Sequence, residues 1–153
     1  MHTARHIYEN APLGSRIAYS SGEPRPPERF TKKLRKWENE NGTGRLVERQ
    51  QGSGSHPAIF TLHLGDFGTE GTIVLVVRRL FSADSPKLFE ILEVPKPGMV
   101  RVLTGHGNRE ELRFLAPDMA SAECWMAENH YSNMRVEVVI DADSVALPKA
   151  EAA

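Results

Sequence analysis

The chain has 153 residues, of which 40% are hydrophobic and 25% are charged, and its formal net charge is -1 at pH 7. This length and apolar content fit one globular domain that can bury a core without disulfides or structural metals. A net charge so near zero excludes a global field that draws the whole molecule to a polyanion, so nucleic-acid binding would require a local basic patch.

Cysteine content and hydropathy indicate the compartment. The single cysteine, Cys124, excludes an intramolecular disulfide and is typical of a reducing environment. The segment MHTARHIYEN at the start of the chain is charged and lacks the apolar stretch of a signal peptide. The longest apolar run, residues 72–77, is far too short to span a membrane. We therefore expect a cytoplasmic protein with no membrane segment.

Residues 1–26 are expected to form an extended N-terminal segment that precedes a single domain at 27–140, with a short strand at 17–19. Three prolines interrupt regular structure between residues 20 and 27, because proline fixes φ and lacks an N–H donor. This stretch should be exposed and similar to polyproline. Its last residue, Pro27, suits the first position of a helix, where the missing N–H has no partner in any case.

A helix is predicted over residues 27–41, closed by Gly42 at its C-terminal cap. At 100° per residue, Phe30, Leu34 and Trp37 fall within an arc of about 60° and form a narrow apolar stripe. We expect this stripe to pack against the core, which would turn the basic residues of the helix towards solvent.

The predicted helix is strongly basic at its start. Residues 25–36 contain six cations and one anion, a local charge of +5, which leaves -6 for the rest of the chain. Such a face can contact phosphates or an acidic partner. Alternatively, it is only a solvated helix face, because lysine and arginine favour helices and keep surfaces soluble. The predicted contact residues are Arg29, Lys32, Lys33, Arg35 and Lys36, with Arg45 on the strand that follows.

The middle of the chain is predicted to be an antiparallel meander, because the connections are too short for parallel crossovers. Glycine-rich segments at 42–44, 50–55 and 65–71 are expected as a turn, a mobile loop and a connection. The expected strands are 45–49, 58–64, 72–81 as the β-branched central strand, 87–94, 99–104 and 111–115.

The C-terminal part is expected to add a helix over 118–129 and a strand over 134–140, followed by a disordered tail at 141–153. Asp118 is a suitable N-cap. The sum is an α+β domain with one mostly antiparallel sheet of five or six strands and two helices. The side chains expected to face the core are Met119, Ala122, Trp125 and Met126 of the helix, and Met134, Val136, Val138 and Ile140 of the strand.

No catalytic, metal or cofactor site is predicted. The GTGR stretch at 42–45 lacks the Lys-Ser/Thr of a phosphate-binding loop. Six scattered histidines and one cysteine form no metal-ligand spacing, and Cys124 has no activating cation beside it. The carboxylate pairs Glu90/Glu93 and Glu110/Glu111 are expected to be solvated surface charges.

These observations favour a small non-enzymatic binding module that acts through a macromolecular partner, with a protein partner slightly preferred. The first alternative is a nucleic-acid-binding accessory or regulatory protein that uses the basic helix at 27–41. The second alternative is an enzyme for a small molecule with a site that no sequence motif reveals.

Overall fold

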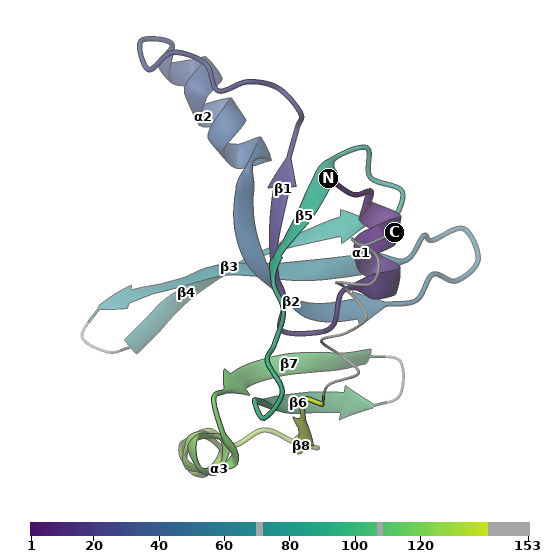
Figure 1. The fold of residues 1–153 in the computed structure, drawn as a ribbon. Helices are drawn as coiled ribbons and strands as arrows, with labels where there is room; N and C mark the ends of the chain where they lie inside the picture. The colour runs from purple at the N-terminus through teal and green to yellow at the C-terminus, as the bar shows by residue number, and fades with distance from the viewer. Residues whose placement is uncertain (70–71, 107–108, 141–153) are drawn as a thin grey trace.

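The computed structural model describes residues 1–69, 72–106 and 109–140 (Figure 1). The predicted α+β class with a mostly antiparallel sheet is confirmed, but these described residues form eight strands in the sheet and three helices, instead of five or six strands and two helices. The helices are α1 (Ala4–Asn10), α2 (Thr31–Glu40) and α3 (Met119–Glu128). The strands are β1 (Arg16–Ser20), β2 (Gly42–Gln50), β3 (Ile59–Thr69), β4 (Thr72–Ser82), β5 (Leu88–Glu93), β6 (Val100–His106), β7 (Arg109–Ala116) and β8 (Arg135–Val138).

The sheet runs in the order β4-β3-β2-β7-β6-β8, and β1 pairs with both β2 and β5. The prediction of a central strand over 72–81 is wrong, because β4 lies at the sheet edge. Residues 65–69, expected as a glycine-rich connection, instead extend β3 and pair with residues 72–77 of β4. A β-branched run favours extended backbone but does not determine whether a strand is central.

The N-terminal residues belong to the core instead of forming an extended segment. Helix α1 buries Ala4 and Ile7 completely, and the Thr3 hydroxyl caps it by accepting from the His6 N–H at 3.2 Å. Strand β1, which includes the predicted 17–19 strand, pairs with two neighbours. The helix is too short for its apolar spacing to stand out in the sequence.

Three arginines hold the chain between α1 and β1 by donating to its backbone carbonyls. Arg45 donates to Gly14 O at 2.6 Å, and Arg101 donates to Leu13 O at 2.8 Å. Arg49 donates to Ala11 O at 2.9 Å and more weakly to Tyr8 O. These charge-assisted bonds provide donors for backbone carbonyls that lie outside the strands of the sheet.

The core consists of two main clusters. Beneath β1, β3, β4 and β5, the rings of Tyr19, Phe60, Phe81 and Phe89 contact one another with centroids 5.1–5.7 Å apart. The second cluster joins α3 to β6 and β7 around Ala122. The predicted Asp118 cap of α3 is confirmed, because its carboxylate accepts from the Ser121 N–H at 2.8 Å.

Strand β8 is present, but its predicted inward face is wrong. Val136 and Val138 are 36% and 46% exposed, whereas Val139 is buried. Glu137 instead faces the buried Arg101 across the β6–β8 pair, and the two side chains form an ion pair at 2.7 Å. The β6–β8 register therefore brings this ion pair together and leaves the two valines partly exposed. The predicted tail at 141–153 lies outside the described residues.

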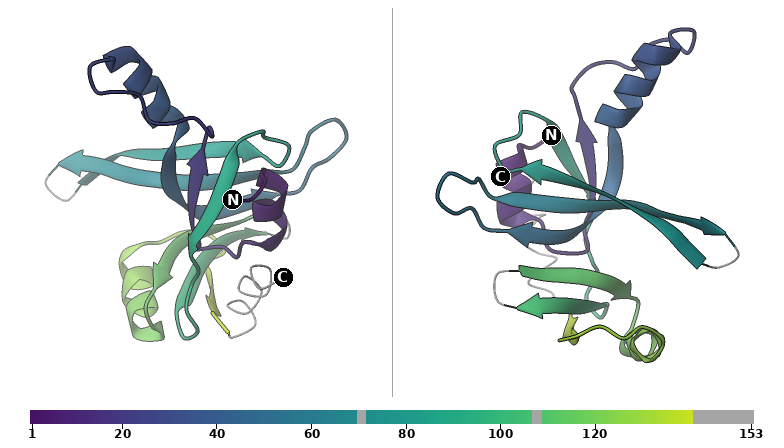
Figure 2. Two further views of the ribbon diagram at one scale, coloured as in Figure 1. Left: turned by 45° about the horizontal axis from the view of Figure 1, so that its top comes forward. Right: turned by 180° about the vertical axis from the view of Figure 1, so that it is seen from behind.

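Helix α2 does not pack against the sheet, so the predicted inward apolar stripe is wrong. The helix begins at Thr31 and projects away from the sheet, and none of its residues is buried (Figures 1 and 2). The predicted turn at 42–44 is also wrong, because these residues begin β2. A Cβ at Gly42 would lie 2.7 Å from Tyr19 Oη, so these glycines permit close strand packing and do not end the helix.

Candidate functional site

Residues 21–41, which we call the arm, leave the sheet after β1 and return at β2 (Figure 1). Strands β1 and β2 are antiparallel neighbours, and Tyr19 pairs with Gly42 at their shared end. A two-residue turn is the commonest connection between strands so placed. The arm therefore has the place of an insertion into a β-hairpin.

The base of the arm is fixed by specific bonds. Asn41 accepts from the Ser21 N–H at 3.1 Å and donates to Trp37 O at 2.8 Å, which ties the two ends of the arm together. From β4, Arg79 donates to Asn39 O while its guanidinium lies over the Tyr19 ring. These contacts set the direction in which α2 points.

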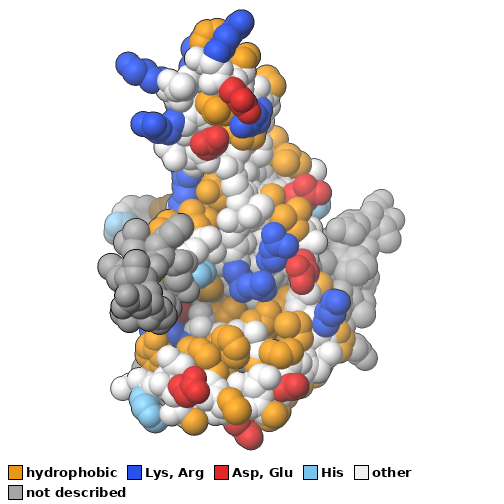
Figure 3. Space-filling view, turned by 90° about the vertical axis from the view of Figure 1, so that its left-hand side faces the viewer, with side chains coloured by type: hydrophobic (Ala, Val, Ile, Leu, Met, Phe, Trp, Pro, Cys, Tyr) orange, Lys and Arg blue, Asp and Glu red, His pale blue; other side chains and the backbone are white. Residues whose placement is uncertain are grey.

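The tip of the arm combines cations with exposed apolar surface. Phe30 is 41% exposed, and the Arg29 and Lys33 cations lie 4.9 and 5.3 Å from its ring centroid. Trp37 packs along the proline-rich stretch and donates from its indole N–H to Glu23 O at 2.9 Å. A groove of ≈ 460 Å³ runs between this indole and the prolines, with lysines at its rim. Figure 3 shows Lys and Arg side chains surrounding the arm at the top of the molecule.

The predicted contact residues separate into two places. Arg29, Lys32, Lys33, Arg35 and Lys36 are all exposed and lie on the arm. Arg45 lies apart from them on β2, where it is partly buried and holds the Gly14 carbonyl. Burial lowers the pKa of Arg45, and the nearby Glu93 partly offsets that effect. The basic surface of the arm therefore consists of Arg29 and the four cations of α2, without Arg45.

A second surface, which the sequence analysis missed, lies where the two halves of the sheet diverge. Strands β2 and β7 share a single register pair, Glu48 with Glu111, and beyond it the strands separate. Two adjoining hollows of ≈ 530 and ≈ 570 Å³ occupy the gap and share Arg113 and Tyr131. We call the pair of hollows the arginine cleft.

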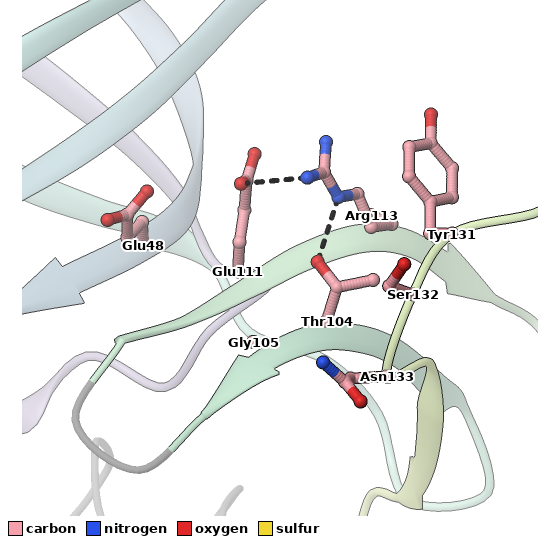
Figure 4. A pocket seen from close by; sticks show the side chains of 8 residues that line it. All are labelled: Glu48, Thr104, Gly105, Glu111, Arg113, Tyr131, Ser132 and Asn133. Carbon is pink, nitrogen blue, oxygen red and sulfur yellow. Dashed lines mark hydrogen bonds and ion pairs between the residues drawn. The ribbon is translucent and has the colours of Figure 1, made fainter.

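The smaller hollow contains a network centred on Arg113 (Figure 4). Arg113 donates from Nε to Thr104 Oγ1 at 2.9 Å and pairs with Glu111 at 3.3 Å, while its guanidinium lies 4.5 Å from the Tyr131 ring centroid. Glu111 also forms an ion pair with Arg78 from β4. Its side chain is only 16% exposed. The prediction that Glu111 is a solvated surface charge is therefore wrong.

The larger hollow is positive and has an aromatic wall. Arg45, Arg78 and Arg113 line it with His63, and none of the described residues that line it is acidic. The rings of Phe114 and Trp125 are stacked 5.2 Å apart, and Trp125 and Tyr131 are stacked 6.0 Å apart. Figure 3 shows basic side chains between the arm and a more apolar surface below it.

The sequence contains only a partial signal for this cleft. Glu111 and Arg113 are two residues apart on β7 and so share a face, as strand periodicity requires. Arg78 and Tyr131 come from β4 and from the loop after α3, and only the fold brings them together. Residue patterns in a single sequence cannot reveal that Arg78 and Tyr131 line the same hollow.

The other residues considered for chemistry stay apart from both surfaces. Cys124 is exposed on α3. The rings of His2 and His6 stack 4.1 Å apart, and burial together with the charge of His2 lowers the pKa of His6. No group of three or more His, Cys, Asp or Glu side chains suited to a metal ion occurs in the part of the chain that the structure describes. Within those same residues, no helix is long and apolar enough to cross a membrane.

Comparison with known proteins places the chain in a family. No curated protein and no solved structure matches it. Residues 2–144 match the model of a family described as uncharacterised conserved protein UCP036055. This match covers most of the chain, including the arm and the arginine cleft, and the protein therefore belongs to this family.

Proposed function

We propose that this protein is a small, non-enzymatic binding module whose arm engages an acidic surface on a protein partner in the cytoplasm. The observation that carries the proposal is the insertion of the arm between two strands that already pair at Tyr19 and Gly42. Ordering these residues costs conformational entropy, and no side chain of α2 is fully buried in return. An ordered insertion that contributes little to the core is best explained by contact with another molecule.

The chemistry of the arm favours a protein over a polyanion. Residues 23–40 contain six cations and four anions, a local charge of +2, and the acidic side chains flank the basic run at 29–36 on both sides. Mixed charges give specificity towards a patterned protein surface, whereas a phosphate backbone would be repelled by the glutamates. The groove between Trp37 and the prolines adds apolar surface for a partner side chain.

Single-stranded nucleic acid is the second candidate, and one observation favours it. Phe30 is exposed between Arg29 and Lys33, an arrangement that allows a base to stack on the ring while the cations contact phosphates. Under this alternative the phosphate contacts are Arg29, Lys32, Lys33, Arg35 and Lys36. Arg45 would contribute only if the bound nucleic acid extended from the arm to the arginine cleft.

Fluorescence anisotropy with two labelled probes tests the proposal. One probe is an acidic peptide that alternates glutamate with leucine and phenylalanine, and the other is an oligothymidylate. We expect the peptide to bind at low salt, with an affinity that falls as salt screens the charges. Changing Lys32, Lys33 and Lys36 together to Glu should abolish binding, because the arm then becomes acidic.

The control changes Lys87 and Lys96 to Glu, which reverses two charges outside residues 21–41 and should preserve binding. Tighter binding of oligothymidylate, lost in the arm variant, would select the nucleic-acid alternative. The proposal fails if neither probe binds at low salt, or if the control variant loses as much affinity as the arm variant.

A further inference from the structure

We propose that the arginine cleft is a binding site for a small molecule in which an anionic group adjoins a planar ring. The cleft is separate from the arm, so this inference does not depend on the proposed function. A phosphate monoester of an aromatic or nucleoside compound and an aromatic carboxylate share this chemistry.

The size and position of the cleft suit a small ligand. Its larger hollow measures ≈ 570 Å³, within the range of about 300–1,000 Å³ that is common for small-molecule sites. It lies between strands β2, β4 and β7, where the sheet halves separate after the Glu48–Glu111 pair, and Trp125 of α3 and Tyr131 of the following loop also line it.

The charges in the larger hollow select an anion. Arg45, Arg78 and Arg113 line it without an acidic residue among the described lining positions. Arg45 and Arg113 are oriented by bonds to Gly14 O and Thr104 Oγ1. A guanidinium has five N–H donors, so these bonds leave further donors that can form paired contacts with a carboxylate or phosphate.

Glu111 acts as an internal counter-ion in the absence of a ligand. Its single carboxylate is shared by Arg78 and Arg113, and its side chain is 16% exposed. Among the described residues that line the two hollows, the three arginines outnumber the two carboxylates of Glu48 and Glu111, so the cleft keeps an excess of positive charge. A ligand anion would therefore compete with Glu111 for the same donors.

The aromatic wall supplies the surface for the planar ring. Phe114, Trp125 and Tyr131 stack nearly parallel, at interplanar angles of 5° and 7°. Arg113 covers the Tyr131 ring, yet Tyr131 remains 44% exposed. Trp125 and Tyr131 both line the hollow that holds the arginines. A ring that packs on them would place an attached anionic group beside the guanidinium groups.

Tryptophan fluorescence gives a direct test, because the chain has only two tryptophans. In a Trp37→Phe background, Trp125 is the sole reporter and lies in the cleft. The probes are phenyl phosphate, adenosine monophosphate and benzoate, with inorganic phosphate and phenol as the separated parts. Calorimetric titration measures binding independently of fluorescence. We expect at least one ring-bearing anion to bind about tenfold more tightly than either separated part.

Three variants are expected to change the affinity of the cleft in different ways. Arg78→Ala should weaken binding about tenfold or more, while the matched control Arg29→Ala, on the arm, should leave it unchanged. Glu111→Gln should strengthen binding because it removes the competing charge. Circular dichroism confirms that each variant is folded. If only the ring-bearing phosphates bind, or only benzoate binds, the result supports the site and identifies the anionic group that it prefers.

The proposal is overturned if no ring-bearing anion gives a saturable titration at millimolar concentration. It is equally overturned if folded Arg78→Ala binds as tightly as the parent, or if folded Glu111→Gln binds more weakly than the parent.

Discussion

Arg101 shows how a charged side chain stabilises this core at the scale of one residue. It is 3% exposed, donates to Leu13 O at 2.8 Å and pairs with Glu137 at 2.7 Å. It thereby connects the N-terminal segment, β6 and β8. The sequence does not predict this role, because a lone arginine in an apolar strand gives no sign of its distant partners.

Replacing Arg101 with Met should lower the free energy of unfolding by about 2–3 kcal/mol, because a buried carbonyl loses a charged donor. The matched control is Arg135→Met, whose side chain is 46% exposed and pairs with Glu110 and Glu137. Its loss should stay below about 1 kcal/mol, since exposed ion pairs contribute little. Urea denaturation of both variants measures the difference. Equal losses would contradict the structural role of Arg101.

At the scale of elements, local patterns predict type better than position. The α3 cap at Asp118 and the strand at 17–19 follow from short-range chemistry, and both are present. The 72–81 run is extended as predicted but lies at an edge, and the glycines at 42–44 lie in a strand. Edge placement and close strand packing depend on partners distant in sequence, which residue patterns do not encode.

Helix α2 is the clearest example. Its apolar stripe of Phe30, Leu34 and Trp37 has the periodicity of a helix that packs on a core, and periodicity cannot identify what the stripe contacts. In the structure, the proline-rich stretch of the arm covers Trp37 in place of the sheet. The candidate cations are exposed in either arrangement. The arginine cleft, in contrast, requires β2, β3, β4, β6, β7 and the region of α3 to meet.

The position of Trp37 has a measurable consequence. Trp37→Ala should lower the global free energy of unfolding by about 1 kcal/mol, because a half-buried ring on a projecting arm contributes little to the cooperative core. Phe89→Ala, at a ring that is fully buried, should cost about 3–5 kcal/mol. Thermal or urea unfolding of the two variants provides the comparison. A loss at Trp37 as large as that at Phe89 would place the helix in the core.

At the scale of the whole molecule, the arm and the cleft occupy separate parts of the structure. The aromatic cluster and the α3 cluster stabilise the two halves of the sheet, and Val47, Leu103 and Leu112 connect them. The cleft lies where these halves diverge, and the arm projects from the β1–β2 end (Figures 1 and 3). This division predicts that partner binding can be removed without loss of the fold.

The most direct measurement replaces residues 20–41 with Asn-Gly, so that a two-residue turn joins Tyr19 of β1 to Gly42 of β2, and then compares unfolding and peptide binding with those of the parent protein. The Tyr19–Gly42 pair allows this closure, and a shorter loop costs less closure entropy. We predict a free energy of unfolding within about 1 kcal/mol of the parent and complete loss of binding to the acidic peptide. A protein that fails to fold, or one that folds and still binds the peptide, would contradict the account.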